Sequence, residues 1–276
     1  MKQNSILQNQ TVQVANTRLR AQRITPGSPS KIDSQKPTLV FLHDAIGSIE
    51  QWRGFPEELV RLTDCPALVY DRQGYGHSDA LTQKRNSQYL EEEALKILPE
   101  VLRVCQIKKT ILIGHSDGGS IALIFAGACP NDIHLQGIIT EAAHVFVEEI
   151  TLEGLRKVLH WAEISDFKKK LSKFHGEKTE TLFSAWIDTW LAETHRHWNI
   201  EKYLSPITCP SLIIQGEEDE YGSPAQVEAI LRQVKGEASS LLIPHCAHIP
   251  HYQAKKEVLK AMQDFILQKG HSLGPL

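Results

Sequence analysis

Short apolar runs recur along the chain, and longer amphipathic stretches separate them. The runs cover residues 38–42, 67–70, 110–113, 137–140, 211–214 and 239–243. Uninterrupted apolar runs of this length are typical of strands buried on both faces of a parallel sheet. The stretches between them predict helices at 49–62, 88–105, 118–128, 224–234 and 255–268. This alternation predicts an α/β fold, with a mostly parallel central sheet flanked by helices.

The N-terminal segment 11–23 alternates between apolar and polar residues, but its phase changes at Ala15 and Asn16. Such a change predicts either an antiparallel edge hairpin that turns there or one edge strand with a bulge.

The strand pattern stops between Ala142 and Ser205, where aromatic residues lie among helical patterns. We therefore expect a helical cap at 142–205, inserted into a core made of 9–141 and 206–269. Trp186 and Trp190 are four residues apart and share a helix face, so they could roof a pocket, although core packing is the default role for such residues.

The pentapeptide Gly114-His115-Ser116-Asp117-Gly118 lies between the apolar run 110–113 and a stretch of small residues. A GxSxG sequence between a strand and a helix predicts a nucleophile elbow, a sharp turn that exposes the serine. Glycines are needed there because a Cβ would collide with neighbouring backbone. A serine hydroxyl becomes a nucleophile only when a base takes its proton and a third group orients that base.

Candidate partners for Ser116 follow two later strands. Four acidic residues occupy 217–220, after the run 211–214, and His248 lies in the loop after 239–243. Because the carboxyl ends of parallel strands meet at one edge of a sheet, these groups can converge on Ser116. The residues alone leave the acid open among Glu217, Glu218, Asp219, Glu220 and Glu141, the last of which follows the run 137–140.

Several motifs together make the chain resemble an α/β-hydrolase fold protein over about residues 11–268. Residues 41–45 resemble the family's HGxx oxyanion loop, 71–78 its D-x-x-G-x-G-x-S segment and 216–219 its acid loop. The resemblance implies Ser116 as nucleophile, His248 as base and then acid, and Asp219 as the carboxylate that holds the imidazole. It also implies an oxyanion hole built from the backbone N–H groups of Asp117 and Ala45.

Two positions depart from the family pattern. Ala247 replaces the glycine before the base, and Asp44 replaces the glycine after the loop histidine. Aspartate tolerates positive φ better than most residues, so the oxyanion loop can survive this change. Asp44 also places a carboxylate near the mouth of the pocket.

Asp44 and Asp117 together suggest a pocket that prefers cationic or amine-bearing substrates. The GxSDGG form resembles the valacyclovir-hydrolase-like branch of the family, in which a carboxylate near the active site receives an amino group. The alternative is that Asp117 only fixes the elbow through local hydrogen bonds. His144 and Phe146, just beyond the run 137–140, either line the acyl or leaving-group side or pack the hinge of the cap.

Composition excludes other classes of function. The net charge is −3 and the charges are interleaved, so we expect no nucleic-acid partner. No window approaches the ~20 apolar residues of a membrane span, and the N-terminus lacks an apolar leader; we expect a cytoplasmic protein. Residues 245–251 hold three histidines, but Pro250 breaks their helical presentation, so we expect no metal.

The sequence thus predicts a Ser-His-Asp hydrolase of small esters, thioesters or lactones that forms an acyl-enzyme and needs no cofactor. The same residues leave open C–C bond hydrolysis, cofactor-free haloperoxidase activity and a slow-turnover small-molecule receptor. They do not predict the oligomeric state.

Overall fold

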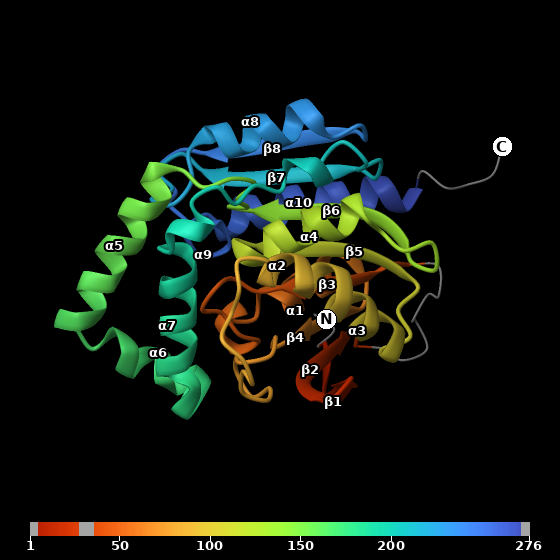
Figure 1. Cartoon of the computed structure of the whole chain (residues 1–276). Coiled ribbons are helices and arrows are strands. Elements are labelled where there is room, and N and C mark those ends of the chain that lie inside the picture. The colour runs from red at the N-terminus through yellow and green to blue at the C-terminus, as the bar shows by residue number, and fades with distance from the viewer. Residues whose placement is uncertain (1–4, 28–35, 272–276) are drawn as a thin grey trace.

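The computed structural model describes residues 5–27 and 36–271, and the strands in these residues form one sheet (Figure 1). The strands are β1 (Ile6–Val14), β2 (Thr17–Thr25), β3 (Thr38–Leu42), β4 (Ala67–Tyr70), β5 (Lys109–His115), β6 (His134–Glu141), β7 (Ser211–Gly216) and β8 (Ala238–Ile243). Their order across the sheet is β1-β2-β4-β3-β5-β6-β7-β8. From β4 to β8 all neighbours in this order are parallel, which confirms the predicted fold class.

The N-terminal segment is an antiparallel hairpin. β1 pairs with β2 from Ile6 opposite Thr25 to Val14 opposite Thr17, and Ala15 in the turn has a positive φ of 49°. The hairpin prediction is therefore confirmed and the single bulged strand is wrong. Because β1 begins at Ile6, the sheet starts before residue 9, where the sequence placed the start of the core.

The flanking helices occupy the predicted stretches with three local differences. They are α1 (Phe55–Thr63), α2 (Tyr89–Glu92), α3 (Leu98–Val104), α4 (Asp117–Gly127), α8 (Pro224–Gln233), α9 (Pro250–Gln253) and α10 (Lys255–His271). One difference is the short helix α9, which was not predicted. The predicted helix 49–62 is split into η2 (Glu50–Trp52) and α1, because Arg53 and Gly54 both have positive φ. The predicted helix 88–105 contains a π-helical turn, η3 (Glu93–Ile97), between α2 and α3.

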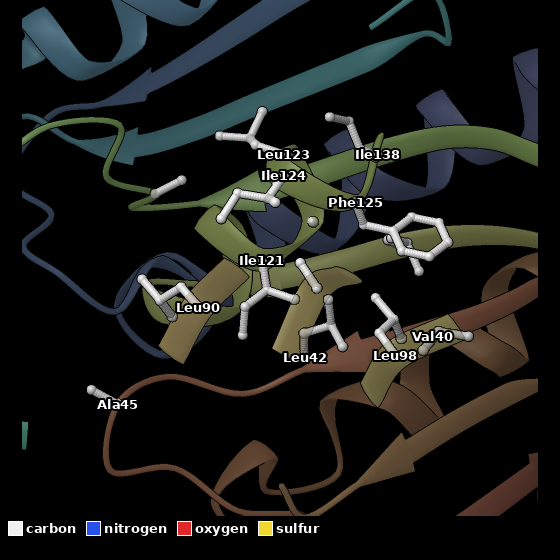
Figure 2. Close-up of a cluster of buried hydrophobic side chains, with 14 of the residues drawn as sticks. Val40, Leu42, Ala45, Leu90, Leu98, Ile121, Leu123, Ile124, Phe125 and Ile138 are labelled. Carbon is white, nitrogen blue, oxygen red and sulfur yellow. The ribbon is translucent and has the colours of Figure 1, made fainter. Parts of the chain in front are cut away.

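Alternate residues of the central strands face two separate apolar cores. Val40 and Leu42 of β3 pack with α4 and α3, and Figure 2 shows this cluster with Ile121 of α4 and Leu98 of α3. Leu39 and Phe41 point the other way and belong to the cluster of α1 and α10. Burial of both faces explains why these strands have continuous apolar runs instead of alternation.

The chain between β6 and β7 forms helices that stand beyond one end of the sheet (Figure 1). They are α5 (Glu149–Ile164), α6 (Phe167–His175) and α7 (Thr179–Trp190), with the short 3-10 turns η4 (Gly176–Lys178), η5 (Glu193–His195) and η6 (Glu201–Tyr203). This end is the one at which β5, β6, β7 and β8 terminate, so the helices lie over the loops that follow those strands. Within the described residues, no helix combines the length and apolar character needed to cross a bilayer.

Candidate active site

Ser116 lies on a strained turn between β5 and α4. Its φ is 54°, a region that residues other than glycine enter at a cost. The flanking glycines leave room for the turn: a Cβ on Gly114 would lie 2.1 Å from the Gly118 carbonyl oxygen, and one on Gly118 would lie 2.0 Å from the Leu42 carbonyl oxygen. The backbone N–H of Ser116 donates to the Glu141 carbonyl oxygen at 2.8 Å. Ser116 therefore belongs to neither element and lies in the turn between the end of β5 and the start of α4.

Three side chains from separate loops form one series of hydrogen bonds. His248 Nε2 lies 3.0 Å from Ser116 Oγ, and His248 Nδ1 lies 2.9 Å from Asp219 Oδ1. The same carboxylate oxygen accepts the backbone N–H groups of Tyr221 and Gly222 at 2.9 and 3.3 Å. This geometry allows His248 to take a proton from Ser116 while Asp219 orients the ring.

The two ionisable members of this series shift each other's pKa. Burial works against the charged form of His248, but the facing Asp219 carboxylate outweighs it and raises the pKa of His248 above its ordinary value. Burial also works against ionisation of Asp219, but the His248 ring and its hydrogen bond outweigh it and lower the pKa of Asp219. The pair therefore makes His248 a stronger base and favours the charged form of the Asp219 carboxylate.

The other candidate acids face different groups. Glu141 binds the backbone N–H and Nδ1 of His251, at 2.9 and 3.1 Å, and is fully buried. Glu218 pairs with His245 at 3.1 Å, and Glu220 accepts only the backbone N–H of His248. The three histidines of 245–251 thus face three different carboxylates, and of the candidate acids only Asp219 lies within hydrogen-bond distance of the His248 ring.

His115, the variable residue of the elbow, has a function that its place in GxSxG did not suggest. Its Nε2 donates to the backbone carbonyl oxygen of His248 at 2.8 Å. Burial, with a smaller contribution from the neighbouring His251, lowers the pKa of His115 to about 4. A neutral His115 therefore ties the loop that carries His248 to the end of β5, next to Ser116.

The two residues predicted to form an oxyanion hole, Asp117 and Ala45, line the same cavity as Ser116. Asp117 is the first residue of α4, where an N–H has no acceptor within its own helix. Ala45 lies in the loop after β3, and the N–H groups of both residues are without an acceptor in the described part of the chain. Asp44 does not have a positive φ, so the loop accommodates aspartate without backbone strain at that position. Arg72 supports the loop through a hydrogen bond to the Asp44 carbonyl oxygen at 2.7 Å.

A cavity of about 200 Å³ opens beside Ser116 and His248, and helices α5 and α7 form much of its wall. The predicted pocket residues Asp44, His144, Trp186 and Trp190 line it, together with Ala45 and Asp117, the two predicted oxyanion-hole residues. Phe146 does not: its backbone pairs with Asn199 and its side chain packs against the core. Of the two roles left open for Phe146, the structure shows packing and not a place in the wall of this cavity, because the chain after His144 pairs with Asn199 before α5 begins.

Other lining residues were not predicted. They are Ile46, Thr151, Leu155, Val158, Trp161, Phe167, Glu220, Tyr221 and Ile249. Thr151, Leu155 and Val158 are spaced as one face of α5, a pattern visible in the sequence. The periodicity identifies the buried face, but it does not say that a cavity lies beneath it.

The polar part of the cavity wall is acidic. Asp44, Asp117 and Glu220 contribute carboxylates, and the described lining contains no lysine or arginine. The Asp117 carboxylate is already bound by the Tyr89 hydroxyl at 2.8 Å and lies 3.6 Å from Arg72. The Asp44 carboxylate has no hydrogen bond or ion pair with any residue that the structure describes. Glu220 accepts the backbone N–H of His248, so Asp44 is the one of these three cavity carboxylates without a hydrogen bond or ion pair to the described residues.

Comparison with known proteins gives a consistent result. Residues 39–261 match the model of the alpha/beta hydrolase family. The chain is 31% identical to the human serine hydrolase BPHL over 203 residues, which cover 72% of this chain and 68% of the relative. It is 22% identical to a proline iminopeptidase of Saccharolobus solfataricus, over 86% of this chain and 87% of that protein. The fold is shared with the enol-lactonase of Burkholderia xenovorans LB400, with a TM-score of 0.71, 16% identity and coverage of 94% and 100%.

Proposed function

The chain belongs to the alpha/beta hydrolase family and is a hydrolase, and on that premise we propose that it cleaves small carboxylic esters, thioesters or lactones through an acyl-enzyme on Ser116. The observation that carries this proposal is the continuous series Asp219, His248 and Ser116, with hydrogen-bond distances of 2.9 and 3.0 Å. A series of this kind beside two free N–H donors is the arrangement required for acyl transfer.

In the proposed reaction, Ser116 Oγ attacks the substrate carbonyl carbon while His248 Nε2 accepts the hydroxyl proton. The negative charge that develops on the carbonyl oxygen is stabilised by the N–H groups of Ala45 and Asp117. His248 then gives its proton to the leaving group, and the C–O or C–S bond breaks. In the second half, His248 takes a proton from water and the water oxygen attacks the acyl carbon. The bond between the acyl carbon and Ser116 Oγ then breaks, and His248 returns its proton to Oγ.

The segment 142–205 is proposed to act as a cap that selects the substrate. Support comes from the cavity wall, where α5 contributes Leu155, Val158 and Trp161 and α7 contributes Trp186 and Trp190. These side chains are apolar or aromatic, so they suit an apolar acyl or leaving group. A small-molecule substrate is the partner that a cavity of about 200 Å³ would admit.

A covalent probe combined with ester turnover tests the proposed function. We expect a fluorophosphonate to label Ser116, with the modified peptide identified by mass spectrometry, and p-nitrophenyl acetate to be hydrolysed over many turnovers. The Ser116→Ala variant should show neither reaction. Tight binding of a small molecule without labelling or turnover would instead indicate a receptor and contradict the proposal.

We further propose that the substrate carries an amine or another cation, which Asp44 receives. An amino-acid p-nitrophenyl ester with a free α-amino group should have a kcat/KM about 10- to 100-fold above that of its N-acetyl analogue, since a charge-assisted hydrogen bond contributes about 1.5–3 kcal/mol. Asp44→Asn should remove this preference. Asp117→Asn should slow both esters to a similar extent, because the Asp117 carboxylate is engaged by Tyr89. Equal kcat/KM values for the two esters in the unmodified protein would refute amine recognition.

A further inference from the structure

His175, the last residue of α6, connects the helices beyond the sheet to two loops of the core. Its side chain is buried, with 2% of the residue exposed. Nδ1 accepts the backbone N–H of Gly76 at 2.9 Å, and Nε2 lies 2.9 Å from the carbonyl oxygen of Ile46. Because a backbone N–H can only donate and a carbonyl oxygen can only accept, the ring must be neutral, with its proton on Nε2. One imidazole therefore satisfies a donor and an acceptor from separate loops.

The Ile46 contact lies next to the proposed oxyanion hole. Ile46 directly follows Ala45, and both residues line the cavity. The same loop is held on its other side by Arg72, whose Nη2 donates to the carbonyl oxygens of His43 and Asp44 at 3.2 and 2.7 Å. The peptide that presents the Ala45 N–H therefore lies between one support from the core and one from α6.

A second residue of the same segment provides a matched comparison. Lys178, in η4, donates to the carbonyl oxygen of Tyr75 at 3.2 Å and also to that of Ser78. It thus holds the segment 175–178 against the loop after β4, as His175 does through Gly76. Within the described residues, Lys178 makes no hydrogen bond or ion pair with the loop after β3, whereas His175 hydrogen-bonds to Ile46 there. Comparing variants at the two positions therefore separates the effect of the Ile46 hydrogen bond from the effect of holding the segment 175–178 against the loop after β4.

We infer that His175 is a positioning residue for the reaction. Its hydrogen bond to the Ile46 carbonyl oxygen fixes the position of the Ala45 N–H. The packing of α6 against the core therefore affects how well the oxyanion is stabilised. This inference rests on the proposed acyl-transfer function. It implies that a change at His175, which does not touch the nucleophile or the base, alters transition-state stabilisation more than substrate binding. The effect should therefore appear in kcat and not in KM.

The test compares His175→Asn with His175→Gln. An asparagine carbonyl can take the place of Nδ1 and accept from Gly76, but its side chain is too short to reach Ile46. A glutamine amide reaches the place of Nε2 and can donate to Ile46. The substrate is p-nitrophenyl acetate, which is small enough to leave most of the cap wall uncontacted. We expect His175→Asn to lower kcat about 10- to 100-fold and to change KM less than about threefold. The loss should be smaller than that of a whole oxyanion donor, which costs about 10²- to 10³-fold. His175→Gln should recover most of kcat.

Lys178→Met is the control, and it should retain the kcat of the unmodified protein even if the melting temperature falls. Hydrogen exchange, measured by mass spectrometry on a peptide that covers residues 43–47, should be faster in His175→Asn and unchanged in Lys178→Met. Equal kcat in all three variants, or a change confined to KM, would overturn the positioning role. Unchanged exchange in His175→Asn would also overturn it. If the unmodified protein neither reacts with the fluorophosphonate nor turns over ester, the acyl-transfer proposal fails, whereas the exchange data still decide whether His175 fixes the loop.

Discussion

The His248→Ala variant is expected to turn over p-nitrophenyl esters about 10⁴- to 10⁶-fold more slowly than the unmodified protein, because nucleophile and base act as a unit. His248 Nε2 is the group within hydrogen-bond distance of Ser116 Oγ, at 3.0 Å. Without it, the hydroxyl proton has no acceptor, and the serine is a weak nucleophile at its ordinary pKa. The measurement is kcat at saturating ester, with protein purified free of other esterases.

The loss should be catalytic and not a failure to fold. In His248→Ala, the Asp219 carboxylate keeps its hydrogen bonds from the backbone N–H groups of Tyr221 and Gly222. Circular dichroism should therefore be unchanged. The double variant with Ser116→Ala should be scarcely slower than either single variant, because each change alone disables the same unit. Activity near that of the unmodified protein in His248→Ala would exclude His248 as the base.

The second large effect is expected from Asp219→Asn, which should lower kcat about 10⁴-fold. An asparagine amide at this position can hold the ring with Nδ1 as acceptor, which leaves a proton on Nε2, the nitrogen that must accept from Ser116. Glu141→Gln is the matched control, because Glu141 is also a buried carboxylate that binds a histidine, His251, but does not contact the His248 ring. Its kcat should stay close to that of the unmodified protein. The opposite result, with Glu141→Gln inactive and Asp219→Asn active, would identify Glu141 at the end of β6 as the acid.

The dependence of kcat/KM on pH distinguishes the role of Asp219 from that of Glu141. Asp219 raises the pKa of His248 against the effect of burial, and the active form of His248 is the neutral one. In the unmodified protein kcat/KM should therefore fall as the pH drops through a pKa that lies above the ordinary histidine value. In Asp219→Asn the largest opposition to burial is lost and only the smaller effects of Glu220 and Asp44 on the pKa of His248 remain, so the acid limb should move to lower pH while the plateau falls. The limb should stay in place in Glu141→Gln.

The sequence predicted most of the scaffold because the central strands are buried on both faces. The runs 38–42 and 67–70 coincide with β3 and β4 at both ends, since a doubly buried strand must be apolar throughout its length. The sequence pattern did not predict that helix 49–62 is broken at Arg53 and Gly54. The break depends on the left-handed backbone of these two residues, which the hydrophobic pattern does not reveal. The sequence also left the role of Phe146 open, because distance from the end of a strand does not give the direction in which the chain turns.

The side chain of Asp117 shows what tertiary packing adds. The sequence left open whether this carboxylate recognises an amine or fixes the elbow. In the structure it receives the hydroxyl of Tyr89, which itself accepts from Trp190 Nε1 at 2.8 Å. The three residues come from α4, α2 and α7, and no local pattern predicts their meeting. This contact shifts the proposed amine subsite to Asp44.

By itself, the sequence determined the parallel sheet, the elbow at Ser116 and the order in which acid and base follow it, because each depends on residue types at fixed local spacing. The tertiary structure alone decided which of several acids faces His248, that the Asp44 carboxylate has no hydrogen bond or ion pair with the described residues, and that His115 and His175 bind the loops of the site. These outcomes depend on contacts between residues far apart in the chain, such as His175 with Ile46 and His115 with His248. Hydrogen bonding in a buried site is set by distances of a few tenths of an ångström, and only the packed fold defines those distances.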